Sequence, residues 1–255
     1  MLNGAWPSVL WNLYDYYFKP GGSYFGAKKA NEPLHIAYDY FTRGVYVVNS
    51  TLTARDKLSA SATLYNIPDL ARKYAVQVHL SAPANAAAKA LTIPPVAGLS
   101  KTYFIRLQLT DTGGAVVSNN LYWYSTSPDT LESKSDWYIT PVRSYADLTG
   151  LNSLASNRKL SAQASVTARG RRQAVEITLR NASATEVAFF VRPEVTAGNE
   201  GPEVVPVSYT DNYVSLWPGE SATITATYDT SDLGGRSPYL RLRGYNVPTS
   251  SIAIP

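Results

Sequence analysis

Carboxylates are the side chains of this chain best suited to acid–base chemistry, and most of them fall in predicted turns. A turn aspartate usually accepts a hydrogen bond from its own backbone, so we expect these groups to be structural. Asp15 and Glu32 lie instead in the opening stretch, where we expect a capping or supporting role. No catalytic residue is therefore predicted on this chain. The turn positions are Asp56, Asp69, Asp111, Asp129, Glu200, Asp229 and Asp232.

The remaining residues give no pattern for a metal, a cofactor or nucleic acid. His35 and His79 fall on different predicted strands, at the surface or at sheet edges, and there is no cysteine, so no metal site is expected. No Ser-His-Asp spacing, P-loop or GxGxxG is present, so no cofactor is expected. Arg169, Arg171 and Arg172 cluster at a predicted hairpin tip without interleaved aromatics. We expect a solvated tip rather than a nucleic-acid contact.

Aromatic side chains in the first forty residues are the best candidates for binding. Flat indole and phenol rings pack against the apolar C–H faces of sugar rings, and their N–H or hydroxyl groups bond sugar oxygens. Trp6 is a candidate for such a contact, although a role in a hydrophobic core is the alternative. Trp11 and Tyr14 are expected to be core residues.

The same opening stretch is predicted to hold two short helices. Apolar residues recur at helical spacing from Ser8 until Pro20 stops the pattern. A second helix is predicted over residues 23–32, with Ser23 as its cap. Because no partner strand precedes these elements, we expect residues 1–32 to be the end of a larger domain that starts earlier. Their orphaned apolar surface is expected to lower solubility or order in isolation.

From residue 33 the apolar period changes to two, which is typical of strands. Seven short strands are predicted in residues 33–127 and seven in residues 158–255, which favours two immunoglobulin-like sandwiches. Without cysteine, neither is the disulfide-bonded type. The predicted strands are 34–40, 45–52, 58–66, 74–82, 90–95, 101–111 and 115–125, then 159–168, 173–181, 187–196, 204–209, 212–217, 221–229 and 239–247.

Residues 128–157 break the strand pattern but keep many large apolar side chains. A free linker would be poorer in such groups, so we expect an ordered connector with one helical turn near residues 144–151. The predicted fold class is mainly β, with two sandwiches, this connector and a short α-helical opening segment.

Composition sets further bounds. A hydrophobic share of 45% is sufficient for real cores, and the net charge of +4 is mildly basic. No apolar run approaches the roughly 18–20 residues that a membrane-spanning helix requires, so no membrane partner is expected. No secretory signal is visible at the start.

Four motifs occur in the order found in one enzyme family. They are NGAWPSVLWNLYDYYFKPGGSYFGAKKANEPLHI (3–36), NLYWYST (120–126), KSDWYITPVRSYADLTGLNSL (134–154) and DNYVSLWPGES (211–221). The first resembles the end of the catalytic (β/α)8 barrel in glycoside hydrolase family 2. The chain is most similar to the exo-β-D-glucosaminidases (exo-chitosanases) of that family, and next to the β-mannosidases.

The resemblance implies that residues 1–32 are a remnant of the barrel and that both catalytic carboxylates precede Met1. It also implies that Asn3 and Trp6 line the sugar pocket beside the upstream nucleophile. The partners it implies are the upstream barrel domain and an oligosaccharide or polysaccharide substrate. By the same resemblance the parent enzyme is expected to be secreted.

Two other interpretations stay open at the level of sequence. In one, the chain is a non-catalytic carbohydrate-binding or adhesive pair of sandwiches. In the other, it is a purely structural pair of surface domains. The first of these predicts polysaccharide binding without a catalytic partner, and the second predicts none.

Overall fold

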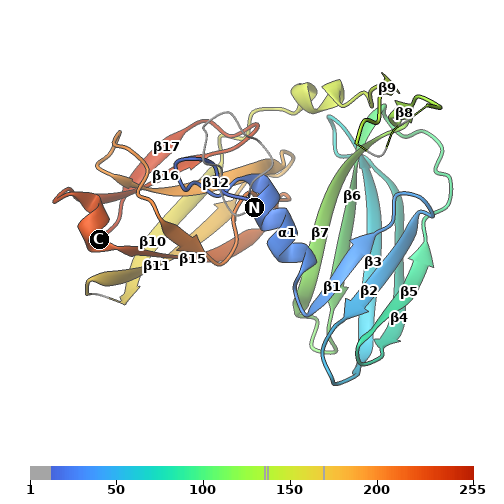
Figure 1. Ribbon diagram of the computed structural model, residues 1–255, viewed down its shortest axis with the longest axis horizontal. Helices are drawn as coiled ribbons and strands as arrows, with labels where there is room; N and C mark the ends of the chain where they lie inside the picture. The colour runs from blue at the N-terminus through green and yellow to red at the C-terminus, as the bar shows by residue number, and fades with distance from the viewer. Residues whose placement is uncertain (1–12, 135, 137, 169) are drawn as a thin grey trace. The chain divides into compact units, whose positions relative to one another are not determined.

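The computed structural model describes residues 13–134, 136, 138–168 and 170–255 (Figure 1). Within them the chain forms mainly strands, with one α-helix and two short 3-10 helices, which confirms the predicted mainly β architecture. The chain divides into two compact units. One unit comprises residues 29–154, and the other comprises residues 155–255 together with the start of the chain as far as Lys28. Asn3, Trp6 and Trp11 lie outside the described residues.

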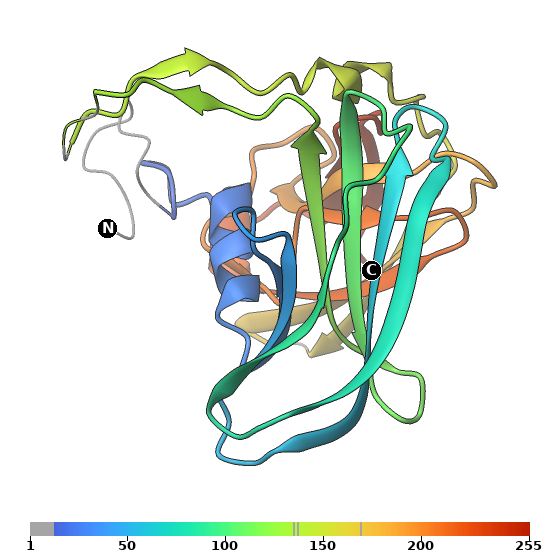
Figure 2. The same ribbon diagram turned by 90° about the vertical axis from the view of Figure 1, so that its right-hand side faces the viewer.

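The first unit is a sandwich of two antiparallel sheets, whose long strands run up the page in Figure 2. Val45 and Val47 of one sheet and Leu64, Ile105 and Leu107 of the other belong to one buried core. They alternate with more exposed residues, as a period of two requires. The three-stranded sheet has the order β1 (Leu34–Tyr38), β2 (Gly44–Asn49), β5 (Ala86–Thr92), and the four-stranded sheet has the order β4 (Arg72–Ala82), β3 (Arg55–Asn66), β6 (Thr102–Thr110), β7 (Val116–Ser125).

The prediction that Asp56 lies in a turn is wrong. Strand β3 already begins at Arg55, and its register with β4 is irregular between Arg55 and Leu58. Lys57 has a φ of 55°, so the strand is bulged there rather than turned. Asp56 is therefore a strand residue.

The second sandwich contains one strand more than predicted. Strand β16 ends at Arg243, and after a short turn the chain returns as β17 (Ser250–Ala253), which pairs with β16. The proline at position 248 supplies no backbone donor, so it falls in the turn between the two strands. One sheet has the order β10 (Leu160–Ala168), β11 (Arg172–Asn181), β15 (Ser221–Asp229), β13 (Val207–Tyr209). The other sheet has the order β14 (Val214–Leu216), β12 (Ala188–Ala197), β16 (Pro238–Arg243), β17. The 3-10 helix η2 (Thr230–Leu233) follows β15.

Each sandwich contains a buried asparagine at the end of its second strand. Asn181 donates from Nδ2 to the carbonyl oxygens of Glu186 at 2.8 Å and Leu216 at 2.9 Å. Asn49 donates in the same way to the carbonyl oxygen of Ala82 at 3.1 Å, and its Oδ1 accepts from the amide of Thr51. Because buried carbonyls need donors, these two amides join segments that the strand ladders leave unpaired.

Residues 128–157, which connect the two sandwiches in sequence, form three short elements in their described part. A two-stranded ribbon of β8 (Thr130–Leu131) and β9 (Val142–Ser144) extends sideways beyond β7 in Figure 2. The predicted helical turn lies slightly later, as the 3-10 helix η1 (Thr149–Ser153). Asp147 fastens this segment to the first sandwich, since Thr102 Oγ1 donates to its carbonyl oxygen and Lys101 Nζ lies 2.8 Å from its carboxylate. Hydrogen bonds from Lys101 and Thr149 hold the pKa of Asp147 well below its usual range.

Candidate functional site

The helix of the opening segment is part of the second sandwich. Helix α1 (Gly22–Ala30) places Phe25, which is 4% exposed, in the core of that sandwich. The Phe25 ring centroid lies 5.9 Å from that of Tyr213 and 6.5 Å from that of Tyr209. Lys28 Nζ donates to the carbonyl oxygens of Tyr209 at 2.8 Å and Thr210 at 2.7 Å. The segment is therefore held by both apolar packing and hydrogen bonds.

A glycine and a strand bulge allow this close packing. A Cβ atom on Gly22 would come within 2.8 Å of the Phe190 ring, so any larger residue would force that ring to move. Phe190 has a φ of 54° and lies where the register of β12 and β14 is irregular. A bulge redirects a side chain, and here the Phe190 ring lies beside Tyr213 with centroids 5.0 Å apart. Helix α1 thus begins at Gly22, two residues after the predicted stop at Pro20, where the absence of a side chain lets it pack closely on the sandwich.

The described part of the first predicted helix is a turn instead. Asp15 Oδ1 accepts from the backbone amides of Tyr17 at 2.8 Å and Lys19 at 2.9 Å. A short polar side chain that binds nearby amides competes with helix hydrogen bonds. Phe18 has a φ of 60°, which ends any helical path. Asp15 therefore has the capping type of role that its position suggested.

Two buried carboxylates organise the charged side of this sandwich. Glu194 is fully buried, and its carboxylate lies 2.6 Å from Arg192, 2.7 Å from Arg241 and 2.5 Å from Arg243. These residues meet because β12 and β16 pair Arg192 with Arg243 and Glu194 with Arg241. A buried carboxylate is tolerated only when cations and donors surround it. The network therefore fixes the outer side of β12 and β16.

The network continues to the opening segment through Glu203. Arg192 Nη2 donates to both carboxylate oxygens of Glu203, at 2.8 and 2.9 Å, and Lys19 Nζ lies 3.5 Å from the same carboxylate. Burial lowers the pKa of Arg192, but Glu203 and Glu194 outweigh it and hold that pKa above its ordinary value. One continuous chain of ion pairs thus joins Lys19 to Glu194.

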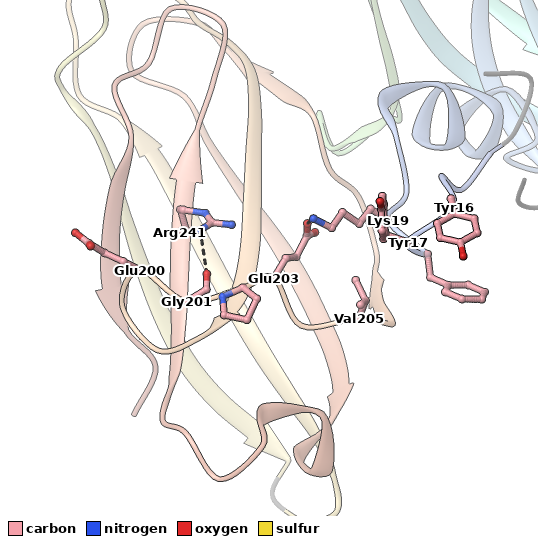
Figure 3. Close-up of a pocket in the computed structure, with 10 residues that line it drawn as sticks. Tyr16, Tyr17, Lys19, Glu200, Gly201, Glu203, Val205 and Arg241 are labelled. Carbon is pink, nitrogen blue, oxygen red and sulfur yellow. Dashed lines mark hydrogen bonds and ion pairs between the residues drawn. The ribbon is translucent and has the colours of Figure 1, made fainter. Parts of the chain in front are cut away.

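An open pocket of about 910 Å³ lies over this network. Figure 3 shows Lys19 extending toward Glu203, and Arg241 donating to the carbonyl oxygen of Gly201. The rings of the opening segment are exposed at its rim, by 43% for Tyr16 and 59% for Tyr17. Its lining consists of Tyr16, Tyr17, Phe18, Lys19, Glu200, Gly201, Pro202, Glu203, Val205 and Arg241.

The arrangement suits binding or docking rather than proton transfer. Glu194 and Glu203 are both paired with cations, whereas a glycosidase needs a carboxylic acid that can give its proton to the leaving oxygen. Among the described residues no group of three or more His, Asp or Glu is placed to hold a metal ion. No helix in the described ranges is long and apolar enough to cross a membrane.

The structure places the other sequence candidates as follows. Most turn aspartates accept backbone amides, at Ala71 for Asp69, at Gly113 for Asp111 and at Ser231 for Asp229. His35 and His79 lie on the edge strands β1 and β4, as expected. Tyr14 is half-buried against Tyr24, with ring centroids 4.9 Å apart.

Sequence reasoning missed the ionic network. Its only signal was the alternation of charged with apolar residues in two predicted strands, at Arg192 and Glu194 and at Arg241 and Arg243. Such alternation predicts a solvated face equally well.

We expect Phe25→Ala to lower the free energy of unfolding of the second sandwich by about 3–5 kcal/mol, because it empties a core position. Urea denaturation of the 255-residue chain, followed by tryptophan fluorescence and circular dichroism, measures this. Phe41→Ala is the matched control, since that ring is 99% exposed. Equal stability of the two variants would show that α1 is not part of the core.

Glu194→Gln should destabilise the same sandwich by about 3–5 kcal/mol, because the buried negative charge that three arginines share is then removed. Glu200→Gln is the control, because Glu200 is exposed and no ion pair of it is seen within the described residues. If thermal and urea unfolding show the same small change in stability for both variants, the ionic network does not stabilise the sandwich.

Two protein-family models match the chain. The one described as the exo-β-D-glucosaminidase Ig-fold domain matches residues 137–247. The one described as the mannosidase Ig/CBM-like domain matches residues 42–127. Between them they cover most of both sandwiches.

Individual relatives match over nearly the whole chain. The exo-β-D-glucosaminidase of Amycolatopsis orientalis is 42% identical over 254 residues, which is 99% of this chain and 25% of that protein. The enzyme of the same name from Streptomyces avermitilis is 45% identical over 256 residues, 99% of this chain and 28% of that protein. The crystal structure of the Amycolatopsis orientalis exo-chitosanase superposes with a TM-score of 0.92 at 44% identity, over 99% of this chain and 30% of that one.

The chain thus spans between 25% and 30% of the length of these relatives. The resemblance stated from the motifs is confirmed. Residues 137–247 match the exo-β-D-glucosaminidase Ig-fold domain, and nearly the whole chain is similar to a part of the exo-β-D-glucosaminidases, which the motifs had linked to glycoside hydrolase family 2.

Proposed function

We propose that this chain is the C-terminal accessory part of a retaining exo-β-glycosidase, an exo-β-D-glucosaminidase that acts on chitosan oligosaccharides. The observation that carries the proposal is the similarity over 99% of the chain to enzymes of that name, of which it matches only 25% to 28%. The catalytic carboxylates are then upstream of Met1. This agrees with the described residues, in which the two buried carboxylates of the candidate site are both neutralised by arginine.

A retaining glycosidase works by double displacement with two carboxyl groups roughly 5 Å apart. One attacks the anomeric carbon and the other protonates the leaving oxygen, then activates the water that hydrolyses the intermediate. In our proposal, Asn3 and Trp6 border the sugar beside that upstream pair. The loop after the last barrel strand lies at the catalytic face of such a barrel.

The second sandwich supports this role through the segment it holds. Residues 13–28 belong to the same compact unit as residues 155–255. Phe25, Lys28 and Lys19 anchor that segment by core packing, hydrogen bonds and an ion pair. In the parent enzyme this anchoring would fix the chain that follows the last barrel strand. The upstream barrel is thus the proposed partner, the sugar chain the proposed substrate, and secretion the proposed location.

A non-catalytic carbohydrate-binding pair of sandwiches is the alternative. It gains some support from the description of the family matched by residues 42–127 as an Ig/CBM-like domain. It differs from the main proposal in needing no upstream barrel for its activity.

We expect the 255-residue chain alone to be catalytically silent on p-nitrophenyl β-D-glucosaminide, and the protein extended upstream through a barrel to release p-nitrophenol. Absorbance of the released phenolate measures both. An upstream Glu→Gln variant at the nucleophile position is the control for contaminating activity. Hydrolysis by the 255-residue chain itself would contradict the proposal.

In the extended enzyme, Trp6→Ala should lower kcat/KM by about tenfold or more, because one sugar-stacking surface contributes on the order of 1.4 kcal/mol to the bound transition state. Trp6→Phe keeps a flat ring and should retain most of the activity. Melting temperatures of the two variants separate a binding effect from a folding effect. Unchanged kinetics for Trp6→Ala would remove Trp6 from the sugar pocket.

A further inference from the structure

The turn between β1 and β2 of the first sandwich is tightly built. Asp39 Oδ1 accepts from the amide of Phe41 at 2.9 Å, and its Oδ2 accepts from Thr42 Oγ1. The amide of Gly44 in turn donates to Thr42 Oγ1 at 3.2 Å, and the amide of Asp39 donates to the carbonyl oxygen of Gly44 at 2.8 Å. Arg43 occupies the left-handed region with a φ of 57°. This turn therefore holds its backbone in one conformation.

The turn presents two aromatic rings to solvent. Phe41 is 99% exposed and Tyr40 is 47% exposed. The Tyr40 ring packs against those of Tyr38, Tyr122 and Tyr124, at centroid distances of 5.4, 5.7 and 5.4 Å. A ring already fixed by its neighbours loses little conformational entropy when a ligand packs on it.

Within the part of the chain that the structure describes, folding stability gives no reason for a ring at Phe41. A fully exposed phenylalanine buries no apolar area, and the hydrogen bonds of the turn use its backbone and not its ring. A residue that departs from the local rules without a structural gain is a candidate for function. The exposed rings of Tyr40 and Phe41, adjacent residues of this turn, form what we call the Tyr40–Phe41 surface.

Polar groups border this surface. The carboxylate of Asp39 is exposed, and the hydrogen bond from Thr42 holds its pKa below the usual value, so it is ionised at neutral pH. Lys89 lies close enough to act on Asp39, and Arg43 close enough to act on Tyr38. Two cations against one carboxylate leave a local excess of positive charge. Ammonium groups are repelled by such a surface, whereas uncharged ligands are not.

We propose that the Tyr40–Phe41 surface binds uncharged β-linked hexose chains, such as the N-acetylated stretches of a glucosamine polymer, through the C–H faces of their sugar rings. Stacking on the exposed rings supplies the apolar contact, and Asp39, Thr42 and Arg43 supply groups that bond hydroxyls. Two exposed rings within a charged border suit one sugar chain. They are too few for the roughly 800 Å² per partner of a stable protein interface.

The proposal does not depend on the catalytic assignment, and a binding titration of the 255-residue chain tests it. The probes are the β-1,4-linked tetramers of N-acetylglucosamine, glucose and glucosamine, followed by calorimetry at neutral pH. We expect the first two to bind and the cationic glucosamine tetramer to bind more weakly, with Lys89→Gln reducing the difference.

Variants of the two rings locate the site. We expect Phe41→Ala and Tyr40→Ala each to weaken binding by about tenfold, the effect of losing one stacked ring. Tyr40→Phe should bind as the parent does. Tyr145→Ala is the matched control, since Tyr145 is 79% exposed elsewhere in the same unit. Unchanged melting temperatures would show that the variants fold.

Three outcomes would overturn the proposal. One is the absence of binding by all three tetramers at millimolar concentration. Another is binding that Phe41→Ala and Tyr40→Ala leave intact. The third is a dimer, seen by sedimentation, that Phe41→Ala dissociates, because the exposed rings would then serve contact between copies of this chain.

Discussion

The buried carboxylate of Glu194 imposes the constraint on which the second sandwich depends. An ion withdrawn from water is costly, so its three arginine partners on β12 and β16 have to stay in place. Arg192 is shared with Glu203, and Glu203 in turn meets Lys19. A sheet, a loop and the start of the chain are therefore joined by one set of charges. The loop carrying Glu203 folds back on β12, where the backbone of Val204 donates to Val195.

Because these charges tie the start of the chain to the second sandwich, the second unit is made of two separate stretches of sequence. Residues 13–28 and residues 155–255 form one compact body, and the whole first sandwich is inserted between the two pieces. Apolar packing supports the same grouping, because Phe25 shares a core with strands of the second sandwich. If the chain follows a catalytic barrel, as proposed, its second sandwich holds the segment next to that barrel. Such an arrangement would let a domain distant in sequence stabilise the end of the catalytic domain.

The extent to which sequence predicted this structure differs from element to element. Ile105, Leu107 and Leu109 alternate with polar residues, and the strand they predict is present as β6. Turn aspartates such as Asp111 cap their own turns, because that interaction is local. The helix expected before Pro20 failed in its described part, because Asp15 binds the amides that a helix needs. Strand β17 was missed because Ser250–Ala253 is short and half-exposed.

By itself the sequence determined the mainly β fold, the positions of most strands, the absence of disulfides and the likeness to one enzyme family. These features follow from periodicity and motifs, which are patterns among residues close together in the chain. Only the tertiary structure decided that Lys19 meets Glu203, that Phe25 lies in the second core and that Phe41 is left exposed. The physical reason is that ion pairing and burial depend on sheet order and loop path. Sheet order and loop path bring together residues that are far apart in sequence, and such contacts cannot be predicted from a local sequence pattern.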